Sequence, residues 1–169
     1  MNFARQLQSE GAVKVEVEQT ADAPIERLFE LLDFSAPGNA FRERGFLFLQ
    51  EPVGCMGRFR ATNPVNPDIV YVFDVIDFQW PSSISLETRF ESDEPLSAVI
   101  KNRRDYTLTS TGPDSCRINL VERSWLKSGL SHKSVRMEHA MRTLSVQLHI
   151  TRLCVHAALG VDEADKLFP

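Results

Sequence analysis

Arg104 and Glu122 are the residues whose types and spacing most clearly allow joint chemistry in this sequence. The segments 100–110 and 115–126 alternate apolar and polar residues around a turn sequence at 112–114, which predicts a β-hairpin. A loop of about three residues brings the apolar faces of both strands together and places Arg104 opposite Glu122. We therefore expect these side chains to form a polar pair on the inner face of a sheet.

This pair has two chemical uses and one structural alternative. Removing the charged side chains of Arg104 and Glu122 from water costs several kcal/mol per charge, and contact between them, water or a ligand must offset this cost. The Arg104 guanidinium could bind a ligand carboxylate or phenolate, and Glu122 could act as a general base if the arginine moved away. Tyr106 and Ser124 share the inner face, so both are candidate ligand-binding residues. The alternative is a pair at the end of the sheet that reaches solvent and has no function.

Asp74 and Asp77 are carboxylates in an otherwise apolar strand, residues 69–78. Because an odd number of positions separates them, a regular strand places them on opposite faces, so we expect one to point inward or to lie near a strand end. A buried, unpaired carboxylate titrates at a raised pH and indicates a functional site, which makes Asp74 a catalytic candidate beside Glu122. Exposure at the edge of the sheet is the alternative.

Histidines and cysteines do not predict a metal site. Four histidines lie in or beside the last helical segment, at His132, His139, His149 and His156. None are four residues apart, the spacing that chelates a metal on one helix face, so we expect surface histidines. The three cysteines are widely spaced and predict reduced thiols. No P-loop, dinucleotide fingerprint, GxSxG or HExxH occurs either, so no metal and no cofactor is expected.

Local patterns predict the elements that must position these residues. Residues 13–18 alternate apolar and charged side chains, as a strand with one buried face does. A short amphipathic helix is expected at 25–33 and a second one at 41–44. Strands are predicted at 46–51, 57–62, 69–78, 83–90, 100–110 and 115–126.

A long helix is predicted over residues 131–159, which contain neither Gly nor Pro, and Gly160 is placed to end it. One apolar stripe of this helix is expected to cover a cavity and to contact a ligand, although packing alone would also explain it. It includes Met137, Met141, Leu144 and Leu148. A second stripe on nearly the opposite side includes Val146, Ile150 and Leu153. We interpret this second stripe as a homodimer contact, with cover by the leader or the tail as the alternative.

Length and charge exclude several classes. At 169 residues the chain predicts a leader at 1–12, one domain at 13–160 and a C-terminal tail at 161–169. The net charge of −4 and the absence of a basic stripe give no support to nucleic-acid binding. No signal peptide and no segment apolar enough to span a membrane is present, so a cytoplasmic location is expected.

The order of these elements resembles the START and birch-pollen-allergen superfamily, also called SRPBCC. The residues that carry the resemblance are 13–20 leading into 23–32, the strand pair 57–62 and 69–78, and 116–126 leading into the long helix. The resemblance implies an α+β helix-grip fold, a curved antiparallel sheet of about seven strands wrapped around the C-terminal helix, with two short helices after the first strand. It also implies a hollow between sheet and helix. The Cys/His motif of Rieske-type members is absent, and the tryptophan-rich motifs of chaperone-activating members are not evident.

Three functions from different classes follow. The first is a carrier or sensor that binds a hydrophobic small molecule, such as a lipid, a sterol-like ring system or an aromatic polyketide, in the hollow. The second is an enzyme of the polyketide cyclase or dehydratase type, in which Arg104, Glu122 or Asp74 moves protons. The third is a protein-interaction domain whose cavity is filled by side chains. Because this superfamily hosts many activities, the resemblance alone does not choose among them.

Overall fold

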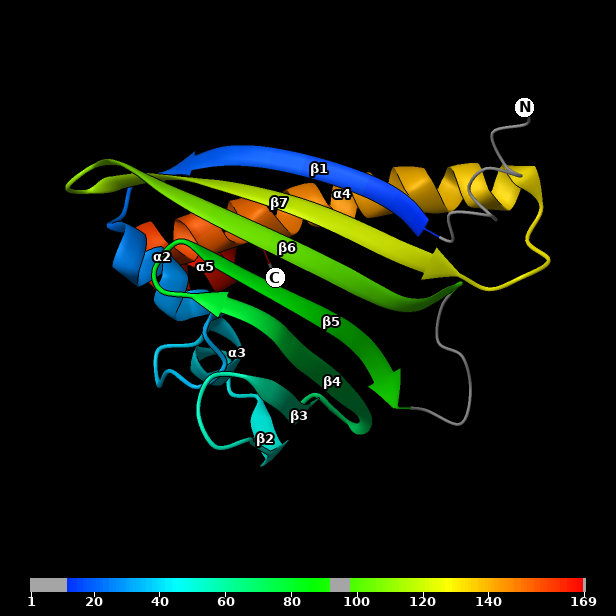
Figure 1. Cartoon of the computed structure of the whole chain (residues 1–169), viewed down its shortest axis with the longest axis horizontal. Helices are drawn as coiled ribbons and strands as arrows, with labels where there is room; N and C mark the ends of the chain where they lie inside the picture. The colour runs from blue at the N-terminus through cyan, green and yellow to red at the C-terminus, as the bar shows by residue number, and fades with distance from the viewer. Residues whose placement is uncertain (1–11, 92–97, 169) are drawn as a thin grey trace.

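One antiparallel sheet and one long helix dominate the structure, a computed structural model that describes residues 12–91 and 98–168 (Figure 1). The sheet has the strand order β1-β7-β6-β5-β4-β3-β2. Its strands are β1 (Ala12–Ala21), β2 (Leu47–Gln50), β3 (Gly57–Asn63), β4 (Asn66–Gln79), β5 (Ser83–Glu91), β6 (Val99–Gly112) and β7 (Ser115–Leu126). The helices are α2 (Ile25–Leu32), α3 (Ala40–Glu43), α4 (His132–Leu159) and α5 (Val161–Leu167). The expected α+β helix-grip fold is confirmed.

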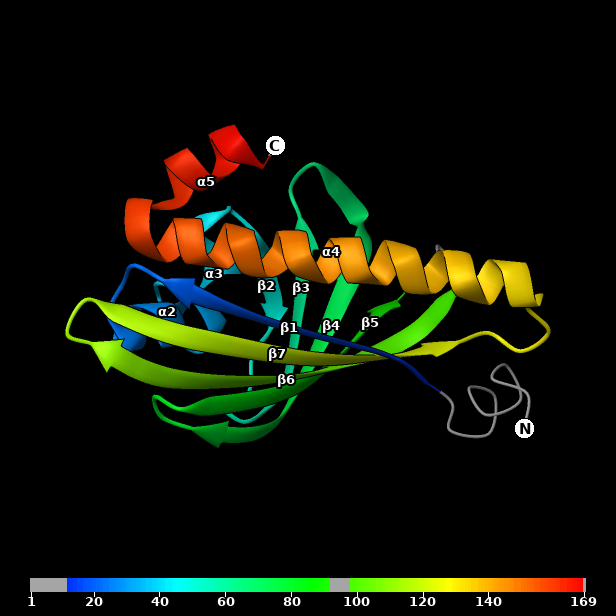
Figure 2. The same ribbon diagram turned by 90° about the horizontal axis from the view of Figure 1, so that it is seen from above.

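Alternation along the edge strand β1 shows why the sheet has one buried face. Val13, Val15 and Val17 are buried, whereas the residues between them are exposed. Since β1 and β2 form opposite edges of the sheet, the chain crosses from one edge to the other through α2 and α3. Figure 2 shows α4 on one side of the sheet, running along β1 and β7, with α2 at the end where α4 finishes. The hydrophobic core lies between these layers.

The helix α4 turns a different face to the sheet from the one predicted. Met137, Met141, Leu144 and Leu148 are between 47% and 62% exposed. Val146, Ile150 and Leu153 are buried against the sheet and are at most 5% exposed. The prediction that the methionine stripe covers the cavity is therefore wrong. The homodimer contact predicted through Val146, Ile150 and Leu153 is wrong as well, since these side chains lie in the core of their own chain.

Polar partners explain the choice of face. The two stripes have similar apolar content, so hydrophobic burial alone favours neither strongly. Beside the buried stripe, His149 bonds to Tyr106 of β6, and Arg142 approaches Glu122 of β7. Exposing this side of α4 would leave the buried Glu122 without one of its cationic neighbours, which is costly.

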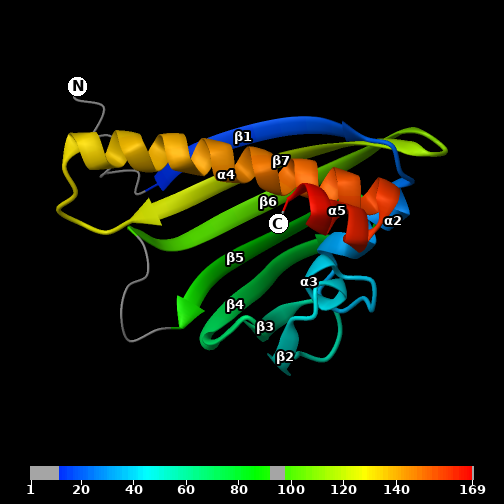
Figure 3. The same cartoon turned by 180° about the vertical axis from the view of Figure 1, so that it is seen from behind.

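The structure describes most of the predicted C-terminal tail but almost none of the predicted N-terminal leader. The leader predicted at 1–12 lies outside the described residues except for Ala12, which belongs to β1. Within the predicted tail, residues 161–167 form α5, which folds back beside α4 in Figure 3. Gly160 separates the two helices and has φ +91°, a conformation that non-glycine residues adopt at a cost. In the described part of the chain, no helix combines the length and the apolarity that crossing a membrane requires.

Candidate functional site

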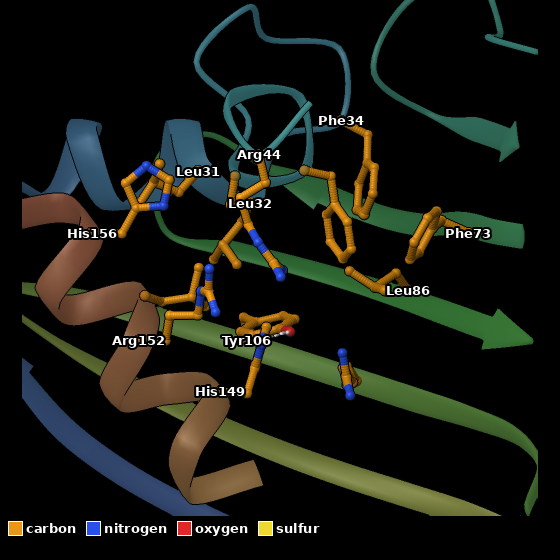
Figure 4. Close-up of a pocket in the computed structure, with 14 residues that line it drawn as sticks. Leu31, Leu32, Phe34, Arg44, Phe73, Leu86, Tyr106, His149, Arg152 and His156 are labelled. Carbon is orange, nitrogen blue, oxygen red and sulfur yellow. Dashed lines mark hydrogen bonds between the residues drawn. The ribbon is translucent and has the colours of Figure 1, made fainter. Parts of the chain in front are cut away.

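An enclosed pocket lies between the inner face of the sheet, the helices α2 and α3, and the C-terminal half of α4 (Figure 4). Its volume is about 50 Å³. Its lining residues are Leu31, Leu32, Phe34, Ala40, Phe41, Arg44, Phe73, Leu86, Arg104, Tyr106, His149, Arg152, Leu153 and His156. The lining is thus mainly aliphatic and aromatic, with six polar or ionisable side chains, as ligand pockets commonly are.

Aromatic rings form one wall of the pocket. The ring centroids of Phe34 and Phe73 are 4.5 Å apart, and Phe41 lies 4.9 Å from Phe73 and 5.6 Å from Phe34. These distances are typical of favourable ring–ring contacts. Phe34 and Phe41 come from the α2–α3 region and Phe73 from β4, so this wall joins segments far apart in sequence.

The one-turn helix α3 places Arg44 at the pocket. Asn39 is fully buried; its side chain donates to the Leu31 carbonyl at 3.0 Å and accepts from the Phe41 amide at 3.0 Å, which fixes the start of α3. Arg44 is the C-cap, and Gly45 follows with φ +80°. The chain therefore turns away immediately after Arg44, whose side chain reaches into the pocket (Figure 4).

The predicted pairing of Arg104 with Glu122 is confirmed. The register of β6 and β7 places the two residues opposite each other, and Arg104 Nε donates to Glu122 Oε2 at 2.7 Å. Glu122 is completely buried and also accepts from Ser124 Oγ at 3.0 Å, while Arg142 Nη1 lies 3.8 Å from its other side. Burial lowers the pKa of Arg104, but Tyr106 and Glu122 more than offset this and raise it above its usual value. Glu122 is therefore held as a fixed counter-ion rather than as a free base.

Tyr106 and His149 form a second polar contact in the pocket. The Tyr106 hydroxyl and His149 Nε2 are 2.8 Å apart (Figure 4). Burial, together with the charges of Arg104, Arg44 and Arg152, holds the pKa of His149 well below 6.5. Burial raises the pKa of Tyr106 to about 12, although Arg104 opposes the shift. At neutral pH the pair is therefore an uncharged phenol beside an uncharged imidazole.

The two remaining polar groups of the lining belong to networks that hold the helices together. Arg152 Nη1 donates to the Phe168 carbonyl at 2.5 Å and Nη2 pairs with Asp165, so the C-terminal segment fixes this side chain. His156 contacts Glu43 of α3, which in turn pairs with Arg27 of α2. Burial raises the pKa of Glu43, but His156 and Arg27 outweigh it and lower that pKa overall.

A second, more open hollow adjoins the first. It has a volume of about 400 Å³ and shares Phe41, Phe73 and Arg104 with the enclosed pocket. Its other walls come from β4, β5, β6 and α4, including Arg142. The enclosed pocket alone is small beside the roughly 300–1,000 Å³ of typical ligand sites, whereas the volume of the second hollow lies within that range.

Asp74 does not belong to either hollow. Its carboxylate pairs with Arg58 at 2.7 Å and with Arg89 at 2.9 Å. Burial raises the pKa of Asp74, but the two arginines more than offset this and lower it. Asp74 is thus an ion-paired carboxylate rather than a candidate base.

The prediction that Asp74 and Asp77 lie on opposite faces is wrong. Asp74 pairs with Glu87 and Asp77 with Ser85, two residues that share a face of β5. A bulge at Ile76 inserts one residue and reverses the alternation, so both aspartates face away from the pocket.

The structure brings together some of the predicted site residues and adds others. Arg104 and Tyr106 line the enclosed pocket, and Glu122 and Ser124 lie directly behind Arg104. The exposed stripe of Met137, Met141, Leu144 and Leu148 lines neither of these two hollows, although Leu148 lines a further open hollow beside His149 and Arg152. Sequence reasoning missed Arg44, Arg152, His149 and His156. His149 and His156 are pocket residues and not the surface histidines that were predicted, whereas His132 and His139 are exposed. The available signal was that His149 and His156 flank the second apolar stripe, which was assigned to a different contact.

No group of three or more potential metal ligands occurs among the described residues. The pocket can bind the apolar body of a ligand against its aromatic wall, and it offers guanidinium, phenol and imidazole groups to the polar end of the same ligand.

The sheet topology and the long C-terminal helix define a protein with the SRPBCC/START-like fold, and solved structures of that fold are similar to this chain. A START superfamily protein from Mycobacterium smegmatis has a TM-score of 0.55 at 16% identity, over 93% of this chain and 99% of that one. Aha1 from Colwellia psychrerythraea, solved as a dimer, has a TM-score of 0.59 at 9% identity, over 88% of this chain and 98% of that one.

DynU16, a protein of the dynemicin biosynthetic locus, has a TM-score of 0.60 at 16% identity over 88% of this chain. This chain matches 48% of DynU16, about half its length. No protein-family model matches the sequence, and no curated protein matches it. At these identities the similarity establishes the fold, and the function must be argued from the pocket.

Proposed function

We propose that this protein binds a hydrophobic small molecule in the pocket between the sheet and α4, as a carrier or sensor. The observation that carries the proposal is the largely apolar pocket with a second hollow beside it, the two sharing Phe41, Phe73 and Arg104 as lining residues. A ligand of this kind would place its apolar body against the aromatic wall. The fold of the START superfamily protein and of DynU16 supports the proposal without naming the ligand.

Native mass spectrometry of the purified protein is the direct test. We expect an adduct on the folded protein, whose mass identifies a hydrophobic molecule after denaturation; the same spectrum reports the oligomeric state. A clean protein that also fails to bind fatty acids, sterols and polycyclic aromatics would contradict the proposal. That result would favour the alternative of a protein-interaction domain with a filled cavity.

A pocket-filling variant localises the binding. Ala40 lines the enclosed pocket and is buried, so Ala40→Leu should occupy space that the ligand needs. We expect the affinity for the identified ligand to fall about tenfold or more, equivalent to about 1.4 kcal/mol. Ala158→Leu makes the same change at an exposed position of α4 and should leave the affinity unchanged. Equal affinities for both variants would place the ligand elsewhere.

An enzyme that transfers protons is a second candidate, and the Tyr106–His149 contact favours it. The neutral imidazole could accept a proton from a bound molecule, and the nearby guanidinium of Arg104 could stabilise the resulting oxyanion. This arrangement replaces the predicted cavity carboxylate, because Glu122 is tied to Arg104 and Asp74 lies outside. Deuterium incorporation into the released ligand in D₂O, lost in His149→Gln, would distinguish this enzyme from a carrier.

A further inference from the structure

The charged groups of the enclosed pocket are unbalanced. Arg44, Arg104 and Arg152 line it, and no acidic residue is among its described lining residues. Glu122 neutralises Arg104 from behind, and Asp165 pairs with Arg152. The Arg44 guanidinium has no ion pair or hydrogen bond within the described residues and only approaches the Phe46 ring, at 5.7 Å. Arg44 is therefore the one lining arginine without an ion-paired acidic partner among the described residues.

Arg44 and Arg152 also act on each other. Figure 4 shows their side chains reaching into the same part of the pocket, one from α3 and one from α4, next to Tyr106. Arg44 as a whole is exposed, but the partial burial of its guanidinium, and then the charge of Arg152, lower the pKa of Arg44, with partial compensation by Asp165. Arg152 Nε is buried and has no hydrogen-bond partner among the described residues. Like charges that are partly removed from water repel each other, and an anion between them would relieve this repulsion.

We infer that Arg44 and Arg152 form the head-group site for a carboxylate on the ligand, an inference that rests on the proposed function. The ligand class is a monocarboxylic acid with an apolar body. The planar guanidinium fork matches a carboxylate, and the presence of one lining arginine without an ion-paired partner matches a monoanion rather than a phosphate dianion. Tyr106 keeps its proton at neutral pH and can donate to the same group.

The volumes agree with this division of the site. About 50 Å³ beside the arginines accommodates a head group, and the adjoining hollow of about 400 Å³ accommodates the body. Phe41, Phe73 and Arg104 line both hollows. An aliphatic acid and an aromatic acid share the chemistry that the arginines recognise, so the experiment must include both.

The test compares acids with the matching alcohols by isothermal titration calorimetry at pH 7.5. The probes are decanoate and 1-decanol, and 2-naphthoate and 2-naphthalenemethanol. For the wild-type protein we expect at least one acid to bind about tenfold or more tightly than its alcohol. Arg44→Met keeps the unbranched stem but removes the charge, so it should abolish this preference while changing the affinity for the alcohol less than about threefold.

Two further variants control the interpretation. Arg44→Lys keeps the charge without the fork and should retain a weakened preference for the acid. Arg117→Met removes an arginine that is exposed on β7 and should leave all affinities unchanged. Without ligand, Arg44→Met should unfold at a higher temperature than the wild-type protein, because it removes the repulsion.

The outcomes separate the head-group site from the proposed function. If the alcohols bind as tightly as the acids, the head-group site is wrong and the binding pocket stands. A preference for the acid that survives in Arg44→Met, or a lower unfolding temperature of that variant without ligand, also overturns the site. If neither acids nor alcohols bind the wild-type protein, both the site and the proposed function fail.

Discussion

The protonation states of a few buried groups determine the character of the pocket. His149 is neutral because it lies in a buried site facing three guanidinium groups, and Tyr106 stays protonated far above neutral pH. The arginines remain charged, so the pocket combines apolar walls with fixed positive charge. This combination could not be predicted from composition, because the residues that create it are separated by more than one hundred positions, from Arg44 to Arg152.

His149 should make stability depend on pH. The folded protein holds its pKa well below 6.5, the value near which the unfolded chain titrates. Below about pH 6.5 the unfolded state binds a proton that the folded state does not, so the free energy of unfolding falls as the pH falls, by up to about 1.4 kcal/mol per pH unit. His149→Gln should weaken this dependence, as measured by urea unfolding at pH 7.5 and 5.0. His139→Gln, at an exposed position of the same helix, should retain it; equal pH dependence in both variants would contradict the assignment.

Glu122→Gln should be strongly destabilising. The amide can still contact Arg104 and Ser124, but the buried guanidinium loses its counter-charge, at a cost of about 3–5 kcal/mol in the free energy of unfolding. Glu16→Gln weakens the exposed pair with Lys14 and should change the free energy of unfolding little, because solvent screens an exposed pair. Denaturant titrations of both variants measure the difference. A similar small loss in both would show that the buried pair contributes little.

Among the elements, the strands and their register were the most predictable, and the orientation of α4 was the least. Alternation and the loop length at 112–114 correctly placed Arg104 opposite Glu122, because both are local properties of one hairpin. The faces of α4 depend on partners in β6, β7 and α3, which no local pattern reveals. The bulge at Ile76 was likewise invisible, since nothing in an apolar strand marks an inserted residue.

Paired alanine substitutions test the orientation of α4. Ile150 is fully buried and Leu144 is 62% exposed, although both belong to apolar stripes of the same helix. Ile150→Ala should lower the free energy of unfolding by about 2–5 kcal/mol, whereas Leu144→Ala should change it by about 0.5 kcal/mol or less. Urea unfolding measures both. A larger loss of unfolding free energy for Leu144→Ala than for Ile150→Ala would contradict this orientation and support the one predicted from the sequence.

For the whole molecule, the order of elements was sufficient to predict the helix-grip fold and a hollow beneath the helix. One sheet with one apolar face and a single long helix leaves few alternatives. The residues that line the hollow could not be predicted from the order of elements. The aromatic wall forms because Phe34 and Phe41 pack on Phe73. The positive charge is present because the turn after α3 places Arg44 at the pocket and because Asp165 of α5 pairs with Arg152. These are tertiary contacts between segments whose local patterns carry no information about one another.

The buried pair also governs which alignments of β6 and β7 are permitted during folding. A slip of one residue would turn the apolar side chains outward and is excluded by hydrophobic burial. A slip of two residues keeps the apolar faces together, but it places Glu122 opposite Asn102 or Tyr106 instead of Arg104. The displaced carboxylate would be buried without a counter-charge, at a cost of several kcal/mol. The alternation of apolar residues thus disfavours a slip of one residue, and the ion pair disfavours a slip of two residues. The hairpin of β6 and β7 that forms a wall of the pocket therefore has a single favourable alignment.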